Sequence, residues 1–261
     1  MSILIFDADK SLSAIGGESQ IIELFGLPPI KINKGLEEAR KYLKGLIQIK
    51  KTISKHPVFE NLEFEEEHRL LSNNANKFNL NTLVFDTITA MGLQEREIIK
   101  RKRMKDIPSL NVLDQQGWGM YADSMNSFIH NICSIEDAVI IVTAHIDPDK
   151  DHEGYIIEFP ALKGSAKTEA QKWFDVIVYT KIIKDKNKTK YYWITKGSDR
   201  KIAKDRKGVL DDVMPQDFSI ILKKYQKAGI QYPKILVLGH SGTGKTYSLK
   251  TLKGVTNESK S

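Results

Sequence analysis

The stretch that decides the fold is GHSGTGKT, residues 239–246, which directly follows the apolar run Ile235–Leu238 near the end of the 261-residue chain. Glycines let the backbone curl so that its N–H groups point at a phosphate. The lysine then reaches the β- and γ-phosphate oxygens, and the last threonine ligates Mg²⁺. A helix that begins at about Gly244 adds the positive end of its dipole. The stretch therefore predicts a phosphate-binding loop for ATP or GTP.

The residues expected to contact the nucleotide form one continuous run. A glycine-rich turn with an incidental lysine is the alternative, but the apolar strand before the loop and the expected helix over Lys245–Lys253 favour the functional interpretation. The predicted nucleotide-binding residues are Gly239, His240, Ser241, Gly242, Thr243, Gly244, Lys245, Thr246 and Tyr247.

Three earlier apolar runs have the form of buried parallel strands that end in polar residues. They are Ile3–Phe6, followed by Asp7-Ala8-Asp9, then Leu83–Thr87 and Val139–His145. Because the carboxyl ends of parallel strands line the ligand crevice of an open α/β sheet, their polar residues should converge beside the loop. These residues are Asp9, Asp86, Thr143 and His145. We expect Asp86 to hold Mg²⁺ through its water shell, together with Thr246.

The chain resembles RecA-like P-loop ATPases, and in detail those that phages encode for single-strand annealing and recombination. The matching stretches are ILVLGHSGTGKT, ILIFDADKS, TLVFDTIT, WGMYADSMNSFIHNI, VIIVTAHID, LKGSAKTEAQKWFDVIVYTKI and YYWITKGSDRKIAKDR. The resemblance implies an α/β fold with a mostly parallel central sheet flanked by helices. Two β-rich runs, Asp175–Tyr179 and Tyr191–Thr195, predict a hairpin extension whose turn is the lysine-rich segment Lys184–Lys190.

The order of the segments departs from this family, whose members begin with the P-loop strand. Here the P-loop strand comes last, which indicates a circular permutation, natural or engineered. Domain termini are often close together and on the surface, so such a rearrangement is tolerated. We therefore expect one domain over residues 1–261, in which 1–228 form the family core and 229–261 carry the permuted P-loop strand and helix.

The resemblance also implies catalytic roles. In this family, an acidic residue at the end of the strand that follows the P-loop helix orients the attacking water. Here that strand is Ile3–Phe6, and Asp9 fits the position better than Asp7. Thr143 and His145 would sense the γ-phosphate, although a purely structural His145 is an equal alternative. Lys204 and Arg206, which follow the hairpin, match the cations that complete the ATP site of a neighbouring subunit in this family. The alternative is that they belong to a solvated charged loop without a catalytic role. The predicted catalytic set is Lys245, Asp9, Asp86, Thr143, Lys204 and Arg206.

A net charge of +7 predicts a polyanionic partner, with a mere excess of surface lysine as the alternative. The densest basic tract is Gln94–Ser109, where Arg101, Lys102 and Arg103 are predicted to bind single-stranded DNA phosphates. Trp118 or Tyr121 could stack on bases, or could pack in the core. The resemblance further implies that Ile146–Thr168 faces the DNA.

These features favour an ATP-binding and hydrolysing recombination protein that binds single-stranded DNA and promotes annealing or strand pairing. It would act as a homo-oligomeric ring or filament, with a phage single-strand DNA-binding protein as a further partner. A ring-forming helicase or packaging motor, and a nucleotide-binding regulatory module without DNA activity, are the alternatives.

Composition excludes other classes of protein. The single Cys133 rules out an internal disulfide. No apolar stretch approaches the roughly 20 residues of a membrane span, and the N-terminus lacks a signal-peptide pattern. We therefore expect no membrane association and a cytoplasmic location, in the host of a phage.

Overall fold

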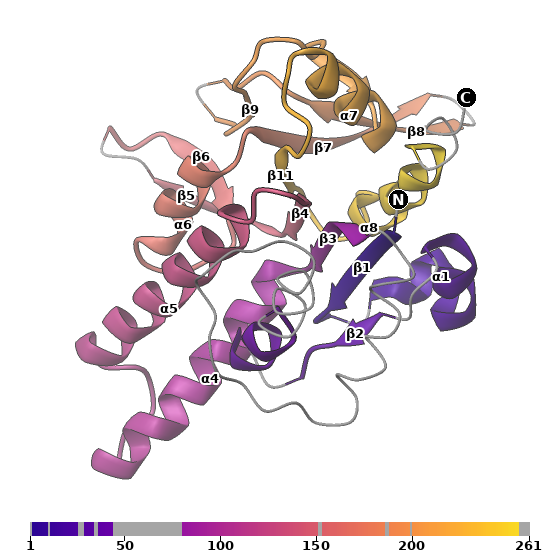
Figure 1. Cartoon of the computed structure of the whole chain (residues 1–261). Coiled ribbons are helices and arrows are strands. Elements are labelled where there is room, and N and C mark those ends of the chain that lie inside the picture. Colours follow the sequence, from indigo (N-terminus) through magenta and orange to yellow (C-terminus); the bar gives the residue numbers. More distant parts are fainter. Residues whose placement is uncertain are drawn as a thin grey trace.

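The computed structural model describes residues 2–9, 11–25, 29–33, 36–43, 80–150, 153–185, 188–198 and 200–255. Its centre is a nine-stranded sheet whose main path runs β10-β8-β7-β11-β4-β3-β1-β2, with β9 paired to β7 (Figure 1). The strands of this sheet are β1 (Ser2–Asp7), β2 (Ile30–Lys31), β3 (Leu80–Asp86), β4 (Val139–Ala144), β7 (Val176–Asp185), β8 (Lys188–Ile194), β9 (Lys204–Asp205), β10 (Val213–Pro215) and β11 (Lys234–Leu238).

The middle of the sheet is parallel and is assembled out of chain order. The P-loop strand β11 pairs in parallel with β4 on one side and with β7 on the other, and β4 in turn pairs in parallel with β3. Strand β4 therefore separates the P-loop strand from the strand that ends in Asp86. Both β4 and β11 are buried along their whole length, which explains the apolar runs Val139–Val142 and Ile235–Leu238 within them.

The hairpin extension is confirmed, but its predicted turn is too long. Strands β7 and β8 pair antiparallel as far as Asp185 and Lys188, so most of residues 184–190 belongs to the strands. The lysines that the structure describes here are exposed. A lysine-rich sequence can therefore remain extended, because backbone pairing holds it and no side chain has to be buried. Strand β10 continues the antiparallel side by pairing with β8.

Helices cover both faces of the sheet (Figure 1). They are α1 (Gly17–Phe25), α4 (Ile88–Asp106), α5 (Gln115–Cys133), α6 (Ala166–Glu169), α7 (Phe218–Lys227) and α8 (Lys245–Ser248), with 3₁₀ turns η1 (Ser11–Ile15), η2 (Ala170–Trp173) and η3 (Leu249–Val255). The helix predicted after the P-loop thus divides into α8 and η3. The alternation of apolar residues with lysines over Gly35–Ile53 predicts an amphipathic helix. Residues 36–43 are helical, whereas 44–53 lie outside the described residues.

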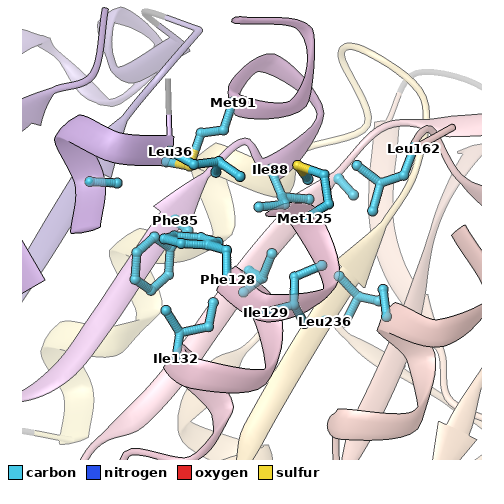
Figure 2. Close-up of a cluster of buried hydrophobic side chains, with 14 of the residues drawn as sticks. Leu36, Phe85, Ile88, Met91, Met125, Phe128, Ile129, Ile132, Leu162 and Leu236 are labelled. Carbon is cyan, nitrogen blue, oxygen red and sulfur yellow. The ribbon is translucent and has the colours of Figure 1, made fainter. Parts of the chain in front are cut away.

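Each face of the sheet has its own hydrophobic core. On one face, α4 and α5 pack against the sheet through side chains such as Phe85, Met91, Met125 and Phe128 (Figure 2). The Phe85 and Phe128 rings meet edge to face, with centroids 5.6 Å apart. The other face is covered by α7, η1 and η3, with Trp193, Phe218 and Leu249 among its fully buried residues.

One expectation about DNA-binding residues needs correction. Tyr121 is only 3% exposed and belongs to the core, because it lies on the inward face of α5, so it cannot stack on bases. Trp118 is partly buried and packs edge to face against it. The segment 146–168 contains the antiparallel strands β5 (Ile146–Lys150) and β6 (Ile156–Pro160) and the beginning of α6, and its position toward DNA stays a prediction. Among the described residues, no helix is both long and apolar enough to cross a bilayer.

Candidate nucleotide-binding site

The P-loop lies between β11 and α8, at the carboxyl edge of the parallel strands. Gly242 and Gly244 have φ angles of +75° and +88°, a conformation that residues with a Cβ rarely adopt. Gly239 is needed for a different reason. A Cβ there would stand 1.7 Å from the Thr180 hydroxyl oxygen of β7. Gly242 and Gly244 therefore allow the backbone of the loop to curl, and Gly239 allows the loop to lie close to the sheet.

Lys245 lies inside the loop rather than in solvent. Its Nζ donates hydrogen bonds to the carbonyl oxygens of Gly239 and His240, at 2.9 and 2.8 Å, and its side chain is largely buried. Burial lowers the pKa of this amine to about 8, although the negative charges of Asp86 and Asp9 oppose the shift. The lysine can exchange these carbonyls for the oxygens of a bound phosphate.

Asp86 is held between two hydroxyl groups. Thr246 Oγ1 donates to Asp86 Oδ2 at 2.9 Å, and Thr143 Oγ1 donates to Asp86 Oδ1. The carboxylate ends β3 and is fully buried. The structure thus brings together three segments that lie far apart in the sequence, with the Asp86 carboxylate at their centre.

Asp9 and His145 lie beside this group. His145 follows β4, and its Nε2 is 3.9 Å from Asp9 Oδ2, while its Nδ1 is 3.5 Å from Lys245 Nζ. Burial and the charge of Lys245 both lower the pKa of His145. Its imidazole is therefore neutral at pH 7 and can act as a hydrogen-bond partner for a phosphate. Asp7, the alternative to Asp9, is buried at the end of β1.

A family model described as an AAA domain matches residues 2–207, which is most of the chain. The chain belongs to this AAA domain family. Membership indicates a nucleotide-binding ATPase of the P-loop type, in agreement with the geometry above. The match includes Asp9, Asp86 and Thr143 but ends before β11 and the P-loop. No curated protein and no solved structure matches the chain.

The oxygen donors of this AAA domain fit Mg²⁺. Within the described part of the chain, no three His, Cys, Asp or Glu residues form a cluster that could hold a metal ion by themselves. Magnesium does not need such a cage, because it keeps several waters and binds one or two carboxylates together with substrate phosphates. Asp86 and the Thr246 hydroxyl, 2.9 Å from each other, supply such a partial donor set.

Two side chains that form hydrogen bonds with the loop were not predicted from the sequence. Thr180 of β7 donates to Thr243 Oγ1 at 2.6 Å, and Gln216 Nε2 donates to the carbonyl oxygen of Thr243 at 3.1 Å. No motif marks either residue, since each reaches the loop only through the pairing of strands. By contrast, Tyr247 is 58% exposed, with Lys250 Nζ 4.7 Å from its ring centroid.

Lys204 and Arg206 lie at the opposite end of the sheet from the P-loop of this AAA domain. Strand β9 pairs with Val176 and Ile177, at the beginning of β7. Arg206 donates to Asp175 Oδ1 at 3.0 Å and to the carbonyl oxygen of Lys172 at 3.1 Å, while Lys204 Nζ donates to Gln171 O. Neither cation can therefore serve the site of its own subunit. Their role in a neighbour's site stays a prediction.

The basic tract lies on α4, which runs beside α5 and away from the sheet (Figure 1). Arg101 and Lys102 are exposed. Arg103 differs, because its guanidinium binds the Asp114 carboxylate at 2.6 and 3.3 Å and its side chain is only 13% exposed. Asp114 also caps the beginning of α5 by accepting from Gly117 N. Arg103 thus connects the two helices, which leaves Arg101 and Lys102 as the exposed members of the predicted trio.

Proposed function

We propose that this AAA-domain protein binds and hydrolyses ATP with Mg²⁺ and uses this cycle to act on single-stranded DNA, promoting annealing or strand pairing. The observation that carries the proposal is the pairing of Thr246 with Asp86, with Lys245 beside them. These are the hydroxyl, carboxylate and ammonium groups that a P-loop ATPase needs, and they come from distant parts of the chain.

Each residue has a role that follows from its position. Lys245 transfers its hydrogen bonds from the Gly239 and His240 carbonyls to the phosphates. Asp86 and Thr246 would hold Mg²⁺, whose charge would offset the negative charge of the phosphates. Asp9, the more exposed carboxylate beside His145, orients the attacking water. His145 and Thr143 respond to the γ-phosphate from the end of β4.

The DNA-binding part of the proposal rests on charge. The chain carries a net charge of +7, and Arg101 and Lys102 extend from an exposed helix. Such cations neutralise nucleic-acid phosphates and release counterions, which makes binding depend on salt. Nucleic acid is therefore the polyanion that we assign to this surface.

Oligomeric assembly is part of the same proposal. Lys204 and Arg206 are far from the P-loop of their own subunit, and the Arg206 side chain is half exposed although it binds Asp175, so a neighbour packed against the beginning of β7 could receive it. A cation supplied to the γ-phosphate stabilises the transition state of hydrolysis. A ring or filament of identical subunits would supply one at every interface.

We also infer that the chain is a circular permutation of its family's order. Two observations support this inference: β11 lies in the middle of the sheet although it is the last strand among the described residues, and the family match begins at residue 2 and ends before the P-loop. The new ends would fall between the P-loop helix and β1, which border one core through Leu249, Leu252 and Ile3.

ATP hydrolysis by the purified protein, measured with and without single-stranded DNA, tests the proposed function. We expect Mg²⁺-dependent hydrolysis that single-stranded DNA stimulates, and none in Lys245→Ala. An equal rate of hydrolysis with and without single-stranded DNA would contradict the recombination role but would leave the proposed ATPase activity intact. An absence of both hydrolysis and nucleotide binding would overturn the whole proposal.

A further inference from the structure

We propose that Thr180 and Gln216 are positioning residues that set the shape of the P-loop, so that the β7–β8–β10 side of the sheet controls nucleotide affinity. The inference rests on the proposed function, because it concerns the same phosphate site. Neither residue needs to touch the nucleotide. Both act through the backbone and side chain of Thr243, in the middle of the loop.

Thr180 starts a chain of hydrogen bonds that crosses the loop. Its neighbour Tyr179 pairs with Leu238, the last residue of β11, so the Thr180 side chain stands where the loop begins. Its hydroxyl donates to Thr243 Oγ1 at 2.6 Å, and Thr243 Oγ1 donates to the His240 carbonyl oxygen at 2.7 Å. Thr180 and Thr243 are 3% and 9% exposed, so water competes little for these bonds.

The fit between Thr180 and Gly239 supports this role. The space that a Cβ on Gly239 would need is occupied by the Thr180 hydroxyl, 1.7 Å from the position of that Cβ. The start of the loop therefore lies directly against β7. Because Lys245 Nζ donates to the Gly239 carbonyl oxygen, a displacement of Gly239 would also move the lysine.

Gln216 holds the other end of the loop. Its Nε2 donates to the carbonyl oxygens of Tyr192 in β8 and Thr243 in the loop, both at 3.1 Å. These two bonds fix the amide next to Gly244, whose φ of +88° belongs to the phosphate-binding curl. A Cβ on Gly244 would stand 2.7 Å from Gln216 Oε1, a buried oxygen that has no hydrogen-bond partner among the described residues.

The physical consequence is preorganisation. The loop N–H groups bind a phosphate only in one backbone conformation, and a loop that is not held in that conformation loses entropy when it binds. Thr180 and Gln216 impose that order before the nucleotide arrives. Their removal should therefore weaken nucleotide binding and raise the KM for ATP, while the chemical step, which depends on Asp86 and Asp9, changes less.

Thr180→Ala tests the inference, with Thr195→Ala as the matched control. Thr195 is also a buried threonine at the hairpin, 2% exposed, but its hydroxyl donates to Asp211 O at 2.6 Å instead of the loop. The measurements are calorimetric titration with ADP and Mg²⁺, the KM and kcat for ATP, and the melting temperature. We expect Thr180→Ala to weaken ADP binding about five- to tenfold, the usual effect of removing one hydrogen bond.

Thr195→Ala should lower the melting temperature without a change in ADP affinity, and Thr180→Ser, which keeps the hydroxyl, should restore most of the binding. Gln216→Leu provides a second variant should Thr180→Ala fail to fold. Equal ADP affinity in wild type and in folded Thr180→Ala or Gln216→Leu would overturn the inference alone. A wild-type protein that binds neither ADP nor ATP would instead overturn the proposed function.

Discussion

At the scale of single residues, Lys245 is the group whose charge state nucleotide binding should change most. Burial lowers its pKa to about 8, so the amine is partly neutral just above that pH in the nucleotide-free protein. Anionic phosphates favour the ammonium form and raise the pKa again. Binding at pH 8.5 should therefore take up a proton, and affinity should fall as the pH rises through about 8.

Calorimetry at pH 8.5 in buffers of different ionisation enthalpy measures this proton uptake. The other titratable groups that face the amine are Asp9, Asp86 and His145; the pKa of His145 is lowered, so it stays neutral at this pH. Lys245→Arg is the control, because a guanidinium remains protonated throughout and should take up no proton. Equal proton uptake by wild type and Lys245→Arg would contradict the assignment.

The residues of the site differ in how far the sequence could reveal them. The placement of Asp86, Thr143 and Lys245 could be predicted because each lies at the end of an apolar strand or in a motif, and parallel strands bring their carboxyl ends to one edge. Thr180 could not be predicted, since its contact with Thr243 depends on the pairing of β7 with β11, across 63 residues of chain.

At the scale of elements, the basic tract on α4 shows that the sequence does not reveal which of its cations are exposed and which form ion pairs. Arg101, Lys102 and Arg103 are equivalent in the sequence, but only the structure reveals that Arg103 faces Asp114 at the beginning of α5. That partner lies on the next helix, beyond the range of any local pattern. The hairpin was likewise predictable from its β-rich runs, whereas its turn was not, because backbone pairing overrode the lysine-rich sequence.

Replacing Arg101 and Lys102 by Gln should weaken single-stranded DNA binding and reduce its salt dependence by about 0.7 in the log–log slope for each phosphate that is no longer neutralised. Fluorescence anisotropy of a labelled oligonucleotide across a salt series measures both quantities. Arg103→Gln is the contrasting variant. It should lower the melting temperature, because it removes the ion pair between α4 and the beginning of α5. An unchanged salt slope in the double variant would mean that the tract is only a solvated surface.

At the scale of the whole molecule, the sheet should not depend on where the chain begins. The beginning of β1 lies near α8 (Figure 1), and β11 is enclosed by β4 and β7 whichever segment comes first. A chain reordered so that residues 229–261 precede residues 2–228 should therefore keep the melting temperature within a few degrees and bind ADP equally well. Failure of the reordered chain to fold would count against the inferred permutation.

Hydrolysis should require assembly, because Lys204 and Arg206 cannot reach the P-loop of their own subunit. A cation supplied in trans contributes about 10³ to 10⁵ in rate. Arg206→Ala and Lys245→Ala should each be inactive, while their mixture should regain activity at interfaces that combine an intact P-loop with an intact Arg206. A mixture that assembles but remains as inactive as its parents would exclude a trans role for Arg206.

The central claim is that Asp86, from the middle of the chain, and Lys245 and Thr246, from its end, form one site for Mg²⁺ and ATP. The most direct measurement is ATP binding and hydrolysis, with and without Mg²⁺, by wild type, Lys245→Ala and Asp86→Asn. We predict that Lys245→Ala binds ATP at least about ten- to a hundredfold more weakly, since its charge-assisted bonds to phosphate are removed. Asp86→Asn should bind ATP but lose Mg²⁺-dependent hydrolysis. Unchanged ATP affinity in Lys245→Ala, or full Mg²⁺-dependent hydrolysis in Asp86→Asn, would contradict the account.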